Sequence, residues 1–485
     1  MLDMLLTAEE MGCADRRAID FYGIDEEILI ENAALALFSE CPEVKSARIF
    51  AGSGNNGADG YALARHLFLN GTDTEIIALF PTKCKNAEIC KKLGIKITPF
   101  PEMEDKDTDL IVDALFGTGL SRNIEGDAEK LISYMNGKEA FKLAVDIPSG
   151  VNADTGGIMG CAFKADKTVT FGFFKTGLFQ YPGHEMAGKI VKKYISIPAD
   201  IPDSSAYLVD GISFDKRSRN TNKGHYGNIL CVAGSKGMAG AAYMAAKAAL
   251  KTGCGLLTVA VPDVIINVVA KKIPEAMTIG CSHNGKTFSR EALSDIKEAA
   301  SKANTLLIGP GIRKSEETAY LVKEAIKLFS GKNIIIDADG LNCLADEPEF
   351  FKGAVITPHP GEMARLMGCD IASVEKDRRL SASSFAKKYG CTVVLKGAIT
   401  ITATPDGKCF YNTTGNPGMA KGGSGDVLSG ITASFLAQGM EGAAYKAAYL
   451  HGLSGDLCLE KFSEYAFTAT DLIKMIPDAI KKCMA

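Results

Sequence analysis

The chain has 485 residues, 46% of them hydrophobic and 23% charged, with a formal net charge of −4. This length exceeds one ordinary core and predicts two domains. The charge balance provides no basic footprint for nucleic acid or a membrane surface. The most hydrophobic stretch, residues 255–270, is broken by Pro262 and Asp263, so no membrane span is predicted. Acids precede any basic cluster at the N-terminus, which argues against a targeting peptide, and we expect a cytoplasmic protein.

The fourteen cysteines are scattered and include no Cys-x-x-Cys pair. Without an export signal, this pattern is typical of reduced, small, buried side chains rather than a disulfide framework.

In the first half, short runs rich in Val, Ile and Leu alternate with longer helical patterns such as residues 58–68. The predicted strands are residues 46–52, 74–80, 109–117, 142–150 and 167–173. This alternation is typical of an α/β fold with a mostly parallel sheet.

A glycine-rich loop, GSGNNGADG at residues 52–60, follows the first of these strands. Gly52, Gly54 and Gly57 satisfy G-x-G-x-x-G between a strand and a helix, which indicates a phosphate-binding turn. A dinucleotide-binding dehydrogenase would place an acid at the end of the next strand, but that strand ends in Phe80 and Pro81. The classical dehydrogenase interpretation is therefore not favoured.

Two further strand ends carry acids: Asp113, followed by residues 114–123, and Asp146, followed by IPSG. The carboxyl ends of parallel strands meet at one edge of a sheet, so we expect both acids near the glycine loop. Asn56, Asp113 and Ser149 offer oxygen ligands suited to a hard cation, and residues 117–123 offer a second phosphate-binding turn. The alternative for each acid is an aspartate that only forms a turn.

Residues 196–211 concentrate Pro, Asp and Ser and interrupt the α/β pattern. We place the domain boundary within several residues of Ser205, which gives domains 1–205 and 206–485.

The most informative stretch of the second half is NTTGNPGMAKGGSGDVLSG, residues 412–430. Gly422, Gly423 and Gly425 allow backbone N–H groups to approach an anion at the start of a predicted helix. Asp426 would repel a bound phosphate unless it serves a metal or a substrate hydroxyl, which favours phosphoryl transfer over passive binding. The alternative is that Asp426 caps the helix.

Other charged features have simpler interpretations. The run KDRR, residues 376–379, is interpreted as a solvated helix face, and the histidines other than His359 lack the spacing of zinc ligands.

The Gly-Ser-Gly-Asp element resembles the closing signature of the ribokinase-like superfamily. Residues 223–261, 306–311, 334–342, 356–366 and 393–397 narrow the resemblance to the nicotinamide nucleotide hydrate dehydratases. The resemblance implies that Asp426 is the base that deprotonates the attacking hydroxyl. It also implies an adenine nucleotide held by Lys396, Gly397, Ala398, Ile399, Thr400 and Gly425, and a hydrated cofactor contacted by Ala241, Gly311, His359 and Asp426.

The first half is similar to the nicotinamide nucleotide hydrate epimerases. The resemblance implies potassium held by Asn56, Asp113 and Ser149, and substrate contacts from Asn55, Asn56, Gly57, Ala58, Asp59, Gly117, Thr118, Gly119, Leu120, Ser121, Arg122, Asn123 and Asp146. Ala58 stands where the family usually has glycine, which helical dihedrals would tolerate. Asp146 is the acid/base candidate for epimerisation.

Both resemblances together imply an N-terminal Rossmann-like three-layer α/β/α domain and a C-terminal ribokinase-like α/β domain. They imply repair of hydrated NADH and NADPH, with K⁺ in the first domain and ADP or ATP, accompanied by Mg²⁺, in the second. Partners would be small molecules, and the oligomeric state stays open, a homo-oligomer included. Two alternatives remain: a small-molecule kinase whose product keeps its phosphate, and a first domain that binds without turnover.

Overall fold

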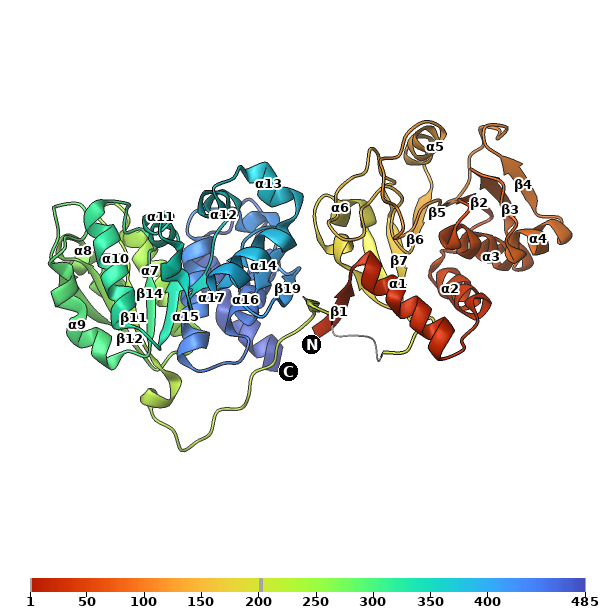
Figure 1. Cartoon of the computed structure of the whole chain (residues 1–485). Helices are drawn as coiled ribbons and strands as arrows, with labels where there is room; N and C mark the ends of the chain where they lie inside the picture. Colours follow the sequence, from red (N-terminus) through yellow and green to blue (C-terminus); the bar gives the residue numbers. More distant parts are fainter. Residues whose placement is uncertain (1, 200–203, 485) are drawn as a thin grey trace. The chain divides into compact units, whose positions relative to one another are not determined.

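The computed structural model describes residues 2–199 and 204–484 (Figure 1). The chain divides into two compact units. One is Met4–Ala206, and the other takes the described chain from Tyr207 onward together with residues 2 and 3. Each unit has its own sheet and its own hydrophobic core.

The N-terminal unit contains a seven-stranded sheet in the order β4-β3-β2-β5-β6-β7-β9, and all of its pairings are parallel. The strands are β2 (Ser46–Ala51), β3 (Asp73–Ala78), β4 (Lys96–Pro99), β5 (Leu110–Ala114), β6 (Phe141–Val145), β7 (Lys167–Phe171) and β9 (Lys189–Lys193). A short strand, β8 (Phe174–Lys175), pairs in parallel with β1 (Leu2–Leu6) through Leu5 and Leu6.

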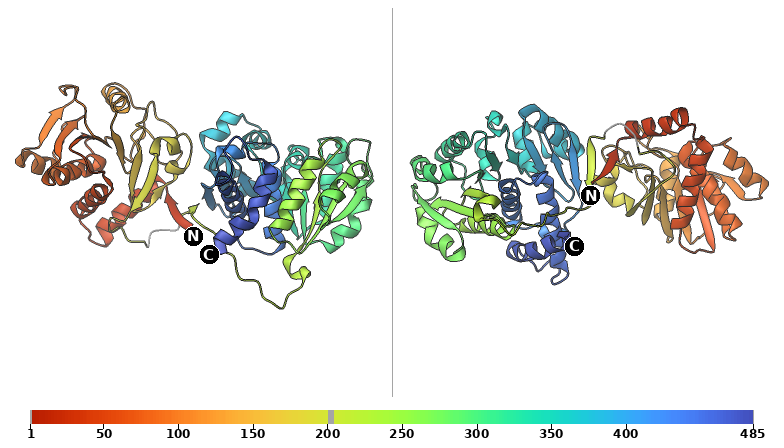
Figure 2. Two further views of the ribbon diagram at one scale, coloured as in Figure 1. Left: turned by 180° about the vertical axis from the view of Figure 1, so that it is seen from behind. Right: turned by 90° about the horizontal axis from the view of Figure 1, so that it is seen from below.

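Successive residues of these strands enter two different cores, as the period of two requires. Ile49 and Ile76 belong to the core that also contains α1 (Ala8–Arg16), α2 (Glu26–Glu40), α3 (Asn55–Leu69) and α4 (Lys85–Lys92). Phe50 and Ile77 face the core of α5 (Asp127–Asn136). The unit is therefore the predicted three-layer α/β/α domain, with its helices on both sides of the sheet (Figures 1 and 2). Its remaining elements are η1 (Arg17–Phe21), η2 (Thr176–Phe179) and α6 (Gly183–Ala187).

The sheet of the C-terminal unit has the strand order β13-β12-β11-β14-β15-β16-β17-β18-β19-β10. The pairings from β13 to β17 are parallel, whereas β18 and β19 are antiparallel. The strands are β10 (Ala206–Val209), β11 (Asn228–Val232), β12 (Leu256–Pro262), β13 (Met277–Cys281), β14 (Thr305–Ile308), β15 (Asn333–Ile336), β16 (Val355–Ile356), β17 (Thr392–Leu395), β18 (Thr400–Ala403) and β19 (Cys409–Asn412).

Helices cover this sheet, and α7 (Ala239–Lys251), α8 (Asp263–Lys272), α15 (Ser424–Ala437), α16 (Ala443–Leu459) and α17 (Ala469–Met484) share one core with it. The others are α9 (Ala292–Lys302), α10 (Glu316–Leu328), α11 (Asp339–Cys343), α12 (Pro360–Met367), α13 (Ile371–Lys376) and α14 (Arg378–Tyr389), with η3 (Lys223–Tyr226), η4 (Pro348–Phe351) and η5 (Pro417–Met419).

Each sheet has a point where the strand order reverses. The chain runs from β2 outward to β4 and then returns to place β5 on the other side of β2. In the second sheet it runs from β11 to β13 and then returns to β14. Ligands of open parallel sheets bind beyond the carboxyl ends of the strands at such points.

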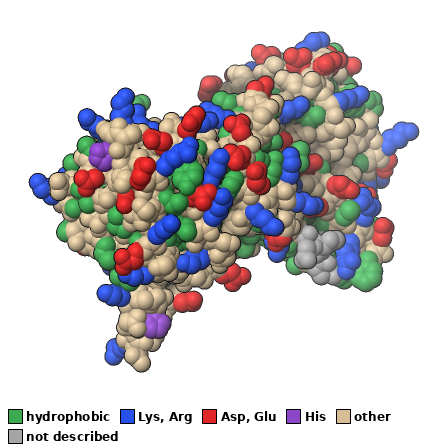
Figure 3. Space-filling view, turned by 60° about the vertical axis from the view of Figure 1, so that its left-hand side comes forward, with side chains coloured by type: hydrophobic (Ala, Val, Ile, Leu, Met, Phe, Trp, Pro, Cys, Tyr) green, Lys and Arg blue, Asp and Glu red, His purple; other side chains and the backbone are tan. Residues whose placement is uncertain are grey.

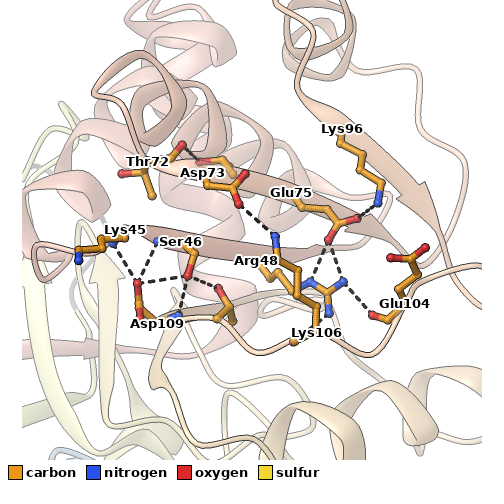
Figure 4. A network of polar contacts seen from close by, with 12 residues as sticks. Lys45, Ser46, Arg48, Thr72, Asp73, Glu75, Lys96, Glu104, Lys106 and Asp109 are labelled. Carbon is orange, nitrogen blue, oxygen red and sulfur yellow. Dashed lines mark hydrogen bonds and ion pairs between the residues drawn. The ribbon is translucent and has the colours of Figure 1, made fainter.

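The opposite edge of the first sheet is occupied by a structural ion-pair network (Figure 4). Arg48 and Glu75 form a buried ion pair of 2.8 Å, and the guanidinium also donates to the carbonyl oxygen of Glu104. Burial acts to raise the pKa of Glu75, but hydrogen bonds from Lys96, Arg48 and Thr98 outweigh it and lower the pKa to about 2. The ion pairs at the amino ends of the strands therefore stabilise the sheet. The candidate functional residues lie at the carboxyl ends.

Acidic and basic side chains are interspersed over the face drawn in Figure 3. Within the described residues, no helix combines the length and apolar character that a membrane crossing requires. All fourteen cysteines are free thiols.

Candidate active sites

A cavity of about 540 Å³ lies at the reversal point of the first sheet. Asn55, Asn56 and Asp59 reach it from the start of α3, and Asp146 reaches it from the end of β6. The turn after β5 contributes residues 115–122. Three loops that are distant in the sequence thus line one cavity, which is large enough for a small ligand.

Glycine is required where the first loop packs against β5. An ideal Cβ on Gly52 would lie 2.0 Å from the carbonyl oxygen of Leu115, and one on Gly57 would lie 2.1 Å from the oxygen of Gly52. Ala58 lies inside α3, where its N–H donates to the oxygen of Gly54 at 3.1 Å. The methyl group therefore occupies a helical position, which any L-residue tolerates.

Asp146 is held in place through one of its two carboxylate oxygens. Its Oδ1 accepts hydrogen bonds from Lys175 Nζ, from Thr170 Oγ1 at 3.1 Å and from the Phe171 N–H at 3.1 Å. Lys175 Nζ also donates to Thr170 Oγ1 and to the Phe171 carbonyl, both at 3.0 Å, so all three ammonium protons are used. The side chains of Lys175 and Asp146 are 1% and 15% exposed. Among the described residues no group bonds to Oδ2 of Asp146, which leaves that oxygen for a ligand in the cavity.

Three more carboxyl groups, those of Asp15, Glu26 and Asp59, line the same cavity, and the pKa values of Asp15 and Asp59 are raised. Burial raises the pKa of Asp15 to about 6, Lys175 lowers it and Asp146 raises it. Burial, followed by the charges of Asp146 and Asp15, holds the pKa of Asp59 well above its usual value. The cavity therefore combines one ion pair with two carboxyl groups whose uncharged form is favoured by burial.

Asn56 lies in the wall of this cavity, whereas Asp113 and Ser149 contact each other outside the wall. Asp113 is fully buried, and its two oxygens accept from the Ser149 N–H at 2.7 Å and from Ser149 Oγ at 2.6 Å. Phe116 N–H donates to Ser149 Oγ, and an ideal Cβ on Gly117 would lie 3.4 Å from Asn56 Cβ. The amide Nδ2 of Asn56 is buried without a hydrogen-bond partner. With its amide turned over, Asn56 would present an oxygen at this buried position, so the three side chains fit a hard cation.

The structure brings most, but not all, of the predicted N-terminal residues to the cavity wall. Asn55, Asn56, Asp59, Asp146 and residues 117–122 line it. The predicted residues outside its wall are Gly57, Ala58, Asp113, Asn123 and Ser149. Burial raises the pKa of Asp113 to about 6, although hydrogen bonds from Ser149 and Leu115 oppose that rise.

In the C-terminal unit, α15 begins at Ser424 after Gly423, whose φ of 96° is left-handed. Asp426 is the third residue of the helix, and its carboxylate makes no capping hydrogen bond. Burial and the charge of Asp337 raise the pKa of Asp426 to about 7, Lys396 lowers it and Asp339 raises it. The geometry therefore does not support the alternative that Asp426 serves only as a cap of α15.

Lys396 connects the predicted residues of this edge. Its Nζ lies 3.2 Å from Asp337 Oδ1 and 3.8 Å from Glu362 Oε2, and an ideal Cβ on Gly425 would lie 3.4 Å from it. Burial acts to lower the pKa of Lys396, but Asp337 and Glu362 outweigh it and raise the pKa. A charged lysine thus lies at the N-terminus of α15, next to Asp426.

His359 caps α12. Its Nδ1 accepts from the N–H groups of Gly361 at 3.0 Å and Glu362 at 3.3 Å, while Glu362 Oε2 accepts from the His359 N–H at 2.8 Å. The imidazole is 56% exposed, so its other edge is accessible to a ligand. At the reversal point between β11 and β14, Ala241 and Gly311 are adjacent, since a Cβ on Gly311 would lie 2.9 Å from Ala241 Cβ.

The interpretation of KDRR as a solvated helix face is wrong for Arg378. The run spans the junction between α13 and α14, and Arg378 is only 7% exposed. Its Nη2 donates to the carbonyl oxygens of Leu395, Lys396 and Ile399. A charge run does not reveal that Asp377 ends one helix and caps the next, which turns Arg378 inward.

Sequence reasoning also missed several charged groups. Asp337 and Asp339 follow β15, so the strand-end argument used for Asp113 and Asp146 could have found them. Glu362 and Lys175 gave no such signal. His451 lies 3.2 Å from Ser424 Oγ, and burial lowers its pKa to about 4, so it is neutral. No group of three His, Cys, Asp or Glu side chains within residues 2–199 and 204–484 could hold a metal ion.

Comparisons with known proteins cover both units. The model of the family described as NAD(P)H-hydrate dehydratase matches residues 229–478, and that of the YjeF-related protein N-terminus matches residues 26–177. The chain is 37% identical to a bifunctional NAD(P)H-hydrate repair enzyme of Moorella thermoacetica, covering 98% of this chain and 96% of that one. It is 32% identical to the enzyme of the same name from Escherichia coli K12, over 97% and 92% of the two chains. A crystal structure of a ribokinase-like superfamily protein from Enterococcus faecalis V583 matches with a TM-score of 0.52 and 27% identity, over 59% of this chain and 99% of that one.

Proposed function

Because this chain belongs to the family of bifunctional NAD(P)H-hydrate repair enzymes, we propose that it carries both repair activities. The C-terminal unit dehydrates hydrated NADH and NADPH at the expense of ADP or ATP. The N-terminal unit interconverts the two epimers of the hydrate. The observation that carries this proposal is the pair of separate sites, each at the reversal point of its own parallel sheet.

In the dehydration, the ring hydroxyl attacks the terminal phosphorus of the nucleotide and gives its proton to Asp426. The phosphorylated carbon then loses phosphate, and loss of a ring proton restores the dihydropyridine. A carboxylate with a pKa of about 7 is matched to proton transfer near neutral pH. A loose phosphoryl-transfer transition state also requires little prior deprotonation, so the position of Asp426 contributes as much as its basicity.

The nucleotide is held by Lys396, Gly397, Ala398, Ile399 and Thr400, together with Gly425. Lys396 contributes a positive charge beside the N-terminus of α15, where the partial positive charge of the helix also favours phosphate. The hydrated cofactor contacts Ala241, Gly311, His359 and Asp426.

Mg²⁺ bound with the nucleotide would neutralise phosphate charge. Such an ion takes one or two protein carboxylates and completes its shell with phosphate oxygens and water, and Asp337 would supply a carboxylate at this site.

In the epimerisation, Oδ2 of Asp146 transfers the proton involved when the configuration at the hydrated carbon is lost and remade. Lys175 fixes the carboxylate through Oδ1 and supplies the compensating charge. Asn55, Asp59 and residues 117–123 hold the substrate. K⁺ bound by Asn56, Asp113 and Ser149 would supply positive charge next to the phosphate-binding turns.

The boundary between the two domains lies near Ser205.

Recovery of NADH absorbance from a mixture of both hydrate epimers tests the proposal, with ADP and ATP in parallel and Asp426→Ala as control. Full recovery that Asp426→Ala abolishes is the expected result. If NADH is recovered from one epimer only, the N-terminal unit does not catalyse epimerisation and acts as a binding module. A stable phosphorylated product without NADH would instead identify a small-molecule kinase.

A further inference from the structure

Arg378 lies at an unexpected place for a cation. It is the first residue of α14, where the partial positive charge of the helix end repels a guanidinium. The side chain is nevertheless 7% exposed, and burial acts to lower its pKa. Helix stability therefore does not explain its position, and its contacts outside the helix must compensate for the cost of burial.

These contacts join both ends of one loop. The loop is residues 396–399, between the antiparallel strands β17 and β18. Arg378 Nη2 donates to the oxygens of Leu395 at 3.2 Å and Lys396 at 3.0 Å, where the loop begins, and of Ile399 at 3.4 Å, where it ends. Nη1 is in turn held by Glu375 Oε1 at 2.9 Å.

The loop is shaped to receive the guanidinium. An ideal Cβ on Gly397 would lie 2.4 Å from Arg378 Nη2, so any side chain there would displace it. The bond to the Lys396 carbonyl also fixes the residue whose Nζ lies beside Gly425. The guanidinium fork lets Arg378 bond the loop through Nη2 and Glu375 through Nη1 at the same time, and the single nitrogen of a lysine cannot occupy both positions.

We propose that Arg378, anchored by Glu375, is a positioning residue that sets the shape of the nucleotide-binding loop. It acts through residues 396–399 and does not itself touch the nucleotide. This inference rests on the proposed function, which assigns nucleotide binding to that loop. It predicts that a change at Arg378 alters the affinity for nucleotide and leaves the affinity for the hydrated cofactor unchanged.

Arg378→Lys in the full chain keeps the charge and removes the fork. We expect the Kd for Mg-ADP and Mg-ATP to rise about tenfold or more, which corresponds to losing one or more charged hydrogen bonds. The KM for the hydrated cofactor and the rate of epimer interconversion should stay within about threefold of the wild type. Gly397→Ala should weaken nucleotide binding in the same direction, because it displaces the guanidinium from the side of the loop. Lys376→Gln, an exposed cation two residues away, is the matched control and should leave the Kd unchanged.

A purely structural role has a different signature. It would lower the melting temperature while the folded molecules kept the wild-type Kd, and that result would overturn the proposal. An equal loss of affinity for nucleotide and hydrated cofactor would overturn it too, since it would indicate general disruption. If the wild type binds nucleotide but forms no NADH, the proposed function fails while the Kd ratio still decides the role of Arg378. Absence of nucleotide binding by the wild type would overturn both.

Discussion

Asp426 should destabilise the domain in which it acts. Burial and Asp337 raise its pKa from 3.8 to about 7, so the folded chain holds a proton that the unfolded chain has released. Stability is therefore greatest below the unfolded pKa and falls as the pH rises from about 4 to about 7. Each pKa unit corresponds to about 1.4 kcal/mol, so the full penalty is on the order of 4 kcal/mol.

Replacement of Asp426 by asparagine removes this penalty together with the base. We expect Asp426→Asn to abolish NADH recovery and, at pH 8, to raise the unfolding free energy by an amount of that order. At pH 4 the two proteins should be nearly equal, because the wild-type carboxyl is then neutral as well. Hydrogen exchange of α15 peptides in a denaturant series measures this domain apart from the other.

Asp370→Asn provides a control of opposite sign. Hydrogen bonds from Ser373 lower the pKa of Asp370, which caps α13, so its replacement should destabilise the chain. If Asp426→Asn leaves α15 no more stable at pH 8 than at pH 4 relative to the wild type, the argument from burial is refuted.

Further predictions concern rate and stability. The kcat/KM for the hydrated cofactor should fall about tenfold per pH unit below about pH 7, and Asp337→Asn should move that limb to lower pH because Asp337 raises the pKa of Asp426. An unshifted limb would assign the titration to another group. Asp146→Asn should slow epimer interconversion by about 100-fold or more while dehydration of the productive epimer continues, as product analysis by chromatography would measure. Lys175→Met should destabilise the N-terminal unit by roughly 3 kcal/mol or more in denaturant titrations, because it leaves a buried carboxylate unpaired; a smaller change would mean that water compensates Asp146.

The predictable part of both sites follows from one rule. Asp113 and Asp146 were proposed because each lies at the end of an apolar strand, and the carboxyl ends of parallel strands meet on one side of the sheet. Asp337 obeys the same rule and could have been found with it. Glycine loops are also visible in sequence, because close approaches such as Gly52 to Leu115 exclude every other residue.

The parts that sequence did not provide depend on tertiary contacts. Lys175 meets Asp146 because the turn after β7 brings its ammonium group back to Thr170 and Phe171 at the end of that strand. Nothing in its local pattern distinguishes it from a surface lysine. Arg378 was assigned to solvent because charge runs usually are solvated, whereas the run is divided between two helices at Asp377 and Arg378 is the first residue of the second. Long side chains can cross several ångströms to a distant loop, so their partners are set by packing rather than by spacing.

The backbone of Asp146 has a φ of 63°, in the left-handed region where glycine is at ease and most residues are not. A change to glycine would therefore relieve the backbone at the same step that removes the carboxylate. Loss of the acid would, however, leave the ammonium group of Lys175 buried without its carboxylate, and that costs more than the backbone relief returns. A descendant that lost only this acid would therefore fold less well than its parent. An intact but inactive domain would have to replace the buried lysine together with the acid, so this pair of residues marks the working form of the domain.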